Sequence, residues 1–181
     1  MAAAPWTRSS LTDAGQVLAL IEPVRGREQA QLGPLAAWCD GLVAKGELTA
    51  AVRFIAHALP RYDCIVWAVR AGLAIGAFDR ADPAIIAVLQ WLDDPSDALR
   101  RAAAEAGEAV PEQSPVTLLC QAVFMSGGSI VPEDLAPVQP PADTCAKLAS
   151  AAVLLGAYAC ADPKAALRQV IELGEAAACG Q

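Results

Sequence analysis

The sequence is poor in the side chains that hold metals or react with substrates. Its 181 residues include one histidine and two methionines, aromatic residues make up 5%, and no two cysteines form a CxxC pair. Zinc sites and thiol redox sites need closely spaced cysteines, or cysteine and histidine together. We therefore expect no metal and no other cofactor, and we interpret the cysteines as small buried residues in a reducing cytosol. They are Cys39, Cys64, Cys120, Cys145, Cys160 and Cys179.

Positive charge and long apolar runs are also scarce. The chain has 13 Lys and Arg against 20 Asp and Glu, a net charge of −7, which is the wrong sign for a protein that follows a phosphate backbone. The longest uncharged apolar stretch, residues 148–161, is too short to cross a bilayer. Residues 1–11 lack the basic and apolar parts of a signal peptide. We expect a cytoplasmic protein that neither binds nucleic acid nor inserts into a membrane.

Alanine is the residue that the chain has in excess. There are 41 alanines against 22 valines and isoleucines together, and apolar residues make up 55%. Alanine has the highest helix propensity, whereas β-branched residues favour strands, so the composition predicts an all-α protein. A chain of this length forms one ordinary domain, residues 1–181, in which residues 1–11 could be a flexible tail.

Helix starts recur as a small, polar or acidic residue followed by proline. A side-chain oxygen at the first position can cap the free N–H groups, which glycine cannot do, and proline fits the first helical position. The pairs are Gly33-Pro34, Asp82-Pro83, Asp94-Pro95, Ser114-Pro115 and Asp162-Pro163. With the apolar periodicity they predict helices at about 12–22, 34–45, 47–59, 62–77, 83–92, 95–108, 115–126, 143–160 and 163–178. We expect a compact irregular bundle of eight or nine short helices in antiparallel hairpins. Helix 62–77 should be central and helix 95–108 peripheral. The alternative is tetratricopeptide-like stacking of helical hairpins.

One long segment, residues 126–142, reads SGGSIVPEDLAPVQPPA and contains four of the thirteen prolines. Neither a helix nor a central strand tolerates so many missing N–H groups, so the segment should be extended. We call residues 126–142 the strap. Its apolar side chains predict packing on the helices, because a flexible linker would be polar. These are Ile130, Val131, Leu135 and Val138.

The lone histidine, His57, follows Arg53 by four residues, so both lie on one helical face. As a catalytic base it would need an orienting carboxylate and a nucleophile, and the local sequence fixes neither. We interpret it as a structural residue near a helix end. The run Ser126-Gly127-Gly128-Ser129 could bind an anion through consecutive N–H groups, but it follows a helix, and a helix stop is the preferred interpretation.

Two further features leave alternatives open. Trp6 stands in a terminal segment without a helical stripe, so it either anchors that segment on the body or is exposed to a partner. The last two predicted helices form a hairpin that would place Cys145 near Cys179, and these two could pair if the chain meets an oxidant. The acidic pair Glu133 and Asp134 is interpreted as a solvated turn rather than a metal site.

Three stretches together resemble a bacterial domain-of-unknown-function family of small helical proteins. They are GELTAAVRFIAHALPRYDCIVWAVRAG, DPSDALRRAAAEAGEA and AVFMSGGSIVPEDLAPVQPPADTCAKLASAAVLLGA. The resemblance implies no established catalytic activity. Relatives in this family are encoded near type VI secretion genes. The resemblance therefore implies a cytoplasmic accessory, adaptor or chaperone-like protein whose partner is a secretion spike or effector protein. It also suggests that Arg53, His57, Trp67 and the Ser126, Gly127, Gly128, Ser129 turn form one joint between the strap and the central helices.

Three functions follow from these observations. The first is a non-enzymatic protein-interaction module. The second is a small-ligand binder or enzyme that uses Arg53, His57 and the turn at residues 126–129. The third is a structural subunit that forms homo-oligomers. An open concave site into which Arg53 and His57 point would favour the second, whereas packing of both side chains with their nitrogens on backbone carbonyls would favour the first.

Overall fold

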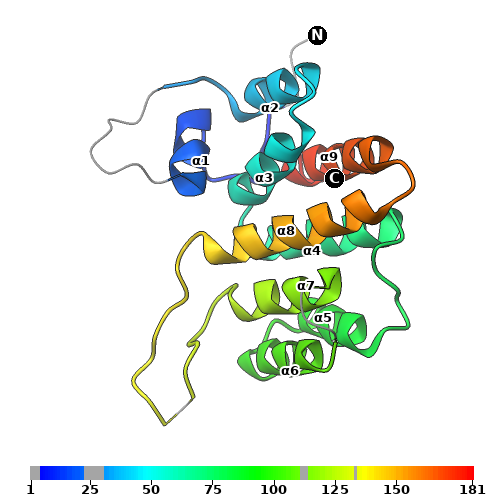
Figure 1. Cartoon of the computed structure of the whole chain (residues 1–181). Helices are drawn as coiled ribbons and strands as arrows, with labels where there is room; N and C mark the ends of the chain where they lie inside the picture. Colours follow the sequence, from blue (N-terminus) through cyan, green and yellow to red (C-terminus); the bar gives the residue numbers. More distant parts are fainter. Residues whose placement is uncertain (1–4, 23–30, 111–113, 133) are drawn as a thin grey trace.

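The computed structural model describes residues 5–22, 31–110, 114–132 and 134–181. Over these ranges the chain forms nine α-helices and no strand, as the composition predicts (Figure 1). The helices are α1 Ala14–Ile21, α2 Leu35–Ala44, α3 Leu48–Ala58, α4 Arg61–Ala74, α5 Pro83–Asp93, α6 Asp97–Glu108, α7 Pro115–Phe124, α8 Thr144–Ala159 and α9 Pro163–Ala178.

Most helix starts follow from the capping residues. Asp82, Ser114 and Asp162 cap α5, α7 and α9 with their side-chain oxygens, and in each case proline occupies the first turn. The prediction is wrong at Asp94-Pro95. There α6 begins two residues later, because Ser96 is the residue whose hydroxyl accepts from the Leu99 N–H.

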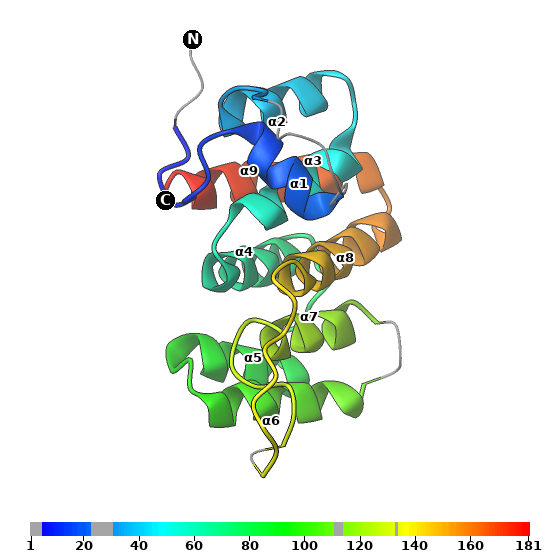
Figure 2. The ribbon, with the colours of Figure 1, turned by 90° about the vertical axis from the view of Figure 1, so that its left-hand side faces the viewer.

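The helices form three levels, which Figure 2 shows from the side. Helices α5, α6 and α7 pack together at one end, α4 and α8 lie in the middle, and α1, α2, α3 and α9 lie at the other end (Figures 1 and 2). In α4, the predicted central helix, Ile65 and Trp67 are fully buried. Since α9 returns to pack on α3 and α4, the contacts go beyond the nearest neighbours that a solenoid uses. The fold is an irregular bundle.

Close contact between α9 and the central helices depends on a glycine. A Cβ added at Gly174 would lie 2.7 Å from Cγ2 of Ile55 and 3.0 Å from Nε1 of Trp67. The Trp67 indole N–H donates to the Val170 carbonyl at 3.1 Å. A buried Trp N–H normally finds such a partner. Trp67 therefore fixes the position of α9 as well as filling the core.

The N-terminal segment is packed from residue 5 onward, and residues 1–4 of the expected tail lie outside the described residues. Trp6 is buried, with its ring centroid 5.9 Å from that of Phe54. The Arg8 N–H donates to the Ala178 carbonyl at 3.0 Å, and the Thr7 hydroxyl to that of Cys179 at 3.2 Å. Trp6 therefore anchors the segment, which is the first of the two alternatives.

All six cysteines are free thiols. The Sγ atom of Cys145 lies 4.0 Å from the Arg61 carbonyl at the start of α4, whereas Cys179 packs by the N-terminal segment. The two cysteines thus have different neighbours, and neither forms a disulfide. Burial raises the pKa of the Cys145 thiol to about 12.

Candidate interaction face

Several helix ends meet on the side of the molecule that faces the viewer in Figure 2, and the strap crosses them. The starts of α4, α6 and α8 and the ends of α5 and α7 contribute. We call this side the strap face. It consists of the strap and of Arg61, Tyr62, Trp91, Asp97, Arg100 and Arg101.

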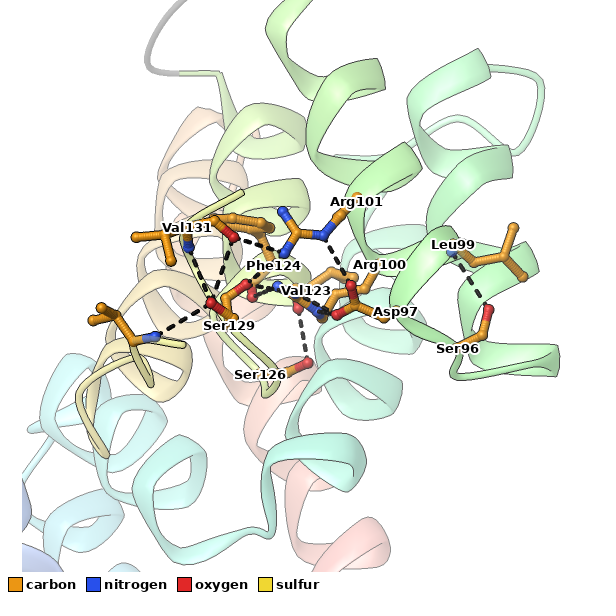
Figure 3. Close-up of polar contacts among 11 residues, drawn as sticks. Ser96, Asp97, Leu99, Arg100, Arg101, Val123, Phe124, Ser126, Ser129 and Val131 are labelled. Carbon is orange, nitrogen blue, oxygen red and sulfur yellow. Dashed lines mark hydrogen bonds and ion pairs between the residues drawn. The ribbon is translucent and has the colours of Figure 1, made fainter. Parts of the chain in front are cut away.

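The side chain of Arg100 holds this face together (Figure 3). Arg100 comes from α6 and is only 3% exposed. Its Nη1 donates to the carbonyl of Phe124, the last residue of α7, and its Nη2 donates to the Ser129 carbonyl at 2.8 Å. Its Nε and Nη2 donate to Oδ1 of Asp97 at 2.9 and 2.6 Å. One guanidinium therefore joins α6, the end of α7 and the strap.

Arg101 extends the same network toward the surface. Its Nη2 donates to the carbonyls of Ser129 at 3.0 Å and Val131 at 2.9 Å, while its Nε donates to Oδ2 of Asp97 at 2.8 Å. Hydrogen bonds from Arg101 and then Arg100 hold the pKa of Asp97 below its usual value. The charged carboxylate thus orients both guanidinium groups toward the strap carbonyls.

The turn at residues 126–129 follows the end of α7 and rests on this network. Gly128 has a φ of +65°, and a Cβ there would lie 2.6 Å from Oδ1 of Asp97 and 2.9 Å from Nη2 of Arg100. Both the backbone conformation and the space require glycine. A Cβ at Gly127, in contrast, would meet nothing within 4 Å. Only one of the two glycines is therefore structurally required.

A cleft of about 570 Å³ opens beside the turn. On one side the rings of Tyr62 and Trp91 lie 5.8 Å apart between centroids, and the Tyr62 hydroxyl donates to the Leu92 carbonyl at 2.8 Å. The carbonyl of Ser126, which also lines the cleft, accepts from the guanidinium of Arg61 at 3.1 Å. The lining residues are Tyr62, Trp91, Pro95, Ser96, Asp97, Arg100, Ser126, Gly127 and Gly128. The cleft thus combines aromatic rings with polar backbone.

Beyond the turn, the strap folds back on itself. The Ile130 N–H donates to the Val138 carbonyl at 2.9 Å, and the Val138 N–H to the Ser129 hydroxyl at 3.2 Å. Leu135 is 54% exposed and Val138 47% exposed, so the prediction that these two side chains pack on helices is wrong. Hydrogen bonds, not apolar packing, order this segment. We call residues 134–139 the strap tip; Glu133 lies outside the described residues.

The structure does not assemble the joint suggested by the resemblance. Arg53 is exposed, and His57, 5% exposed, is bonded through Nδ1 to the Arg53 carbonyl at 2.7 Å. Its Nε2 is buried without a hydrogen-bond partner among the described residues, and burial lowers the pKa of the ring. Neither residue lines the cleft, and Trp67 is bonded to α9. Only one ring nitrogen bonds a backbone carbonyl and Arg53 is exposed, so neither of the two outcomes expected for Arg53 and His57 is met in full.

Within the described ranges, no group of three or more His, Cys, Asp or Glu side chains could hold a metal ion. No helix there is long and apolar enough to cross a membrane.

Residues 38–178 match the model of a family of unknown function, DUF6931. The chain belongs to this family. The matched range includes the strap, the cleft and the whole of α9, so the strap face lies within the part of the chain that the DUF6931 model describes. No curated protein and no solved structure matches the chain.

Proposed function

We propose that the chain is a non-enzymatic protein-interaction module that presents the strap tip to a protein partner. The observation that carries the proposal is the exposure of Leu135 and Val138 at the end of a segment held by the buried Arg100. Exposed apolar side chains on an ordered loop are typical of binding sites, because a loop without such a role is usually polar.

The hydrogen bonds of the strap support this role. Arg100 and Arg101 together bind the carbonyls of Ser129 and Val131, and the Ile130 N–H closes the strap on Val138. A segment that is already ordered loses less conformational entropy on binding than a flexible one. The tip can therefore bind with its few apolar side chains and still reach useful affinity.

Charge and family context indicate the kind of partner. The net charge of −7 favours a partner with a basic surface, since complementary potentials speed the encounter. From the resemblance to proteins encoded near type VI secretion genes, we propose a cytoplasmic accessory, adaptor or chaperone-like protein that binds a spike or effector protein.

Affinity capture from the native host, followed by mass spectrometry, tests the proposal. The informative variant is Leu135→Ser with Val138→Ser. The matched control is Ile86→Ser with Leu155→Ser, since both residues are 41% exposed and lie on α5 and α8. We expect the same partner with the wild type and the control, and its loss with the strap variant at an unchanged melting temperature. Equal recovery of that partner by all three proteins would refute the role of the tip.

A further inference from the structure

We propose that the cleft on the strap face is occupied by the strap tip of a second copy of the chain. Two copies then pair about a two-fold axis, and each tip enters the cleft of the other. The inference rests on the proposed function for the role of the tip as a binding element, and it adds the cleft as the receiving site. A second copy would cover the strap face while no other partner is bound.

The cleft has the chemistry that receives an extended, proline-containing segment. Such segments bind to grooves lined by aromatic rings, where proline and aliphatic side chains pack on the ring faces. Tyr62 is exposed at the surface of the cleft, and its ring packs on that of the buried Trp91. Pro95 adds a further apolar surface beside them.

The strap tip has the matching chemistry. Its exposed residues include Pro137, with the aliphatic side chains of Leu135 and Val138 beside it, and proline and aliphatic side chains pack on aromatic rings in such grooves. Pro140 is buried on its own chain, whereas Pro137 is exposed. The tip is thus fixed at its base and apolar at its end.

Symmetry favours a closed pair over an open chain. A two-fold interface uses the same patch on both copies, so a protrusion and its receiving cleft must lie in one patch. Here the strap begins at Ser126, Gly127 and Gly128, which themselves line the cleft. The tip and the cleft therefore share one face, and an axis passing between them brings each tip to the other cleft.

Charge at the contact is complementary as well. The tip carries the exposed carboxylate of Asp134 next to Leu135. Near the cleft, Arg61 is half-buried, and its Nη1 donates to the Ser126 carbonyl. The side chain of Arg101 is 30% exposed. Either guanidinium can therefore meet an incoming carboxylate without giving up its bonds to the strap.

Sedimentation velocity over a series of protein concentrations measures the dimer directly. Gly127→Gln adds a long side chain to a residue that lines the cleft, at a position where a Cβ meets no heavy atom within 4 Å. Gly41→Gln on α2 is the matched control, since its Cβ also meets nothing within 4 Å and it lies outside the strap face. We expect the wild type and the control to dimerise alike. Gly127→Gln, and separately Leu135→Ser with Val138→Ser, should raise the dissociation constant about tenfold or more.

Mixing the two defective variants tests the reciprocal geometry. The intact tip of the Gly127→Gln protein should enter the intact cleft of the strap variant, so the mixture should form heterodimers that neither variant forms with itself. A wild type that stays monomeric at every concentration would overturn the inference. So would a dimer that both variants leave unchanged. Because partner capture is measured separately, the two proposals can fail independently. A wild type that captures its partner through the tip but stays monomeric would reject the second copy and keep the proposed function. A wild type that dimerises through the tip, with partner capture unaffected by the strap variant, would reject the proposed function alone.

Discussion

The buried guanidinium of Arg100 should stabilise the fold far more than its neighbour Arg101 does. Replacing Arg100 by methionine keeps much of the length of the side chain, but it removes the guanidinium that lies over the Phe124 ring and donates to the carbonyls of Phe124 and Ser129. An unpaired buried acceptor costs about 1–3 kcal/mol. The Phe124 carbonyl loses its donor, whereas the Ser129 carbonyl keeps Arg101, so the free energy of unfolding should fall by about 2 kcal/mol. Asp97 also loses a charged partner.

The same change at Arg101 is the control. Its side chain is 30% exposed, so water can replace its bonds to the Ser129 and Val131 carbonyls. Partly exposed pairs of this kind contribute about 1 kcal/mol or less. Urea unfolding followed by tryptophan fluorescence gives both free energies under the same conditions.

A second measurement separates a loose strap from a general loss of stability. Hydrogen exchange at the Ile130 amide, which donates to the Val138 carbonyl, should become faster in Arg100→Met. Amides within α3 should remain the more strongly protected ones in both proteins. If Arg100→Met costs no more than Arg101→Met, or if Ile130 exchanges as in the wild type, the reasoning about the buried network is wrong.

Three further changes have defined outcomes. Gly128→Ala should cost about 1–3 kcal/mol because of its positive φ and its contact with Asp97, whereas Gly127→Ala should stay within about 0.5 kcal/mol; thermal melts that show equal losses would contradict this. Gly174→Ala should cost about 1–3 kcal/mol, since its Cβ overlaps Ile55, and an unchanged urea midpoint would show that α9 can shift. Burial lowers the pKa of His57 below its unfolded value of 6.5. The unfolded chain therefore binds a proton more readily than the folded chain does, so the free energy of unfolding falls as the pH drops from about 6.5 through the folded pKa. His57→Asn, which does not titrate, should lose less stability than the wild type between about pH 7.5 and about pH 5.5, and parallel losses would exclude His57 as the cause.

Helices could be predicted well because their signals are local. The capping oxygens of Asp82 and Ser114 act on N–H groups two or three residues away, and the apolar periodicity of α4 is contained in α4 itself. The misplaced start of α6 arose where Asp94 and Ser96 offered competing caps two residues apart.

The strap face could not be predicted, because its contacts join distant parts of the chain. The spacing of Asp97, Arg100 and Arg101 indicates ion pairs within a helix, which is correct. It does not show that both guanidinium groups also reach carbonyls 24 to 30 residues further on. For the same reason helix 95–108 is predicted only as peripheral: α6 does lie at one end of the bundle (Figure 1), but its buried Arg100 joins α7 and the strap.

The packing of α9 has a consequence for folding during synthesis. Residues 163–178 cover Ile55 and Trp67, which leave the ribosome about a hundred residues earlier, and the Trp67 indole finds its carbonyl partner only on Val170. Until α9 arrives, the largest buried side chain of α4 lacks both its cover and its hydrogen bond. The nascent chain should therefore be most exposed to aggregation late in synthesis, when α3 and α4 are complete and still uncovered.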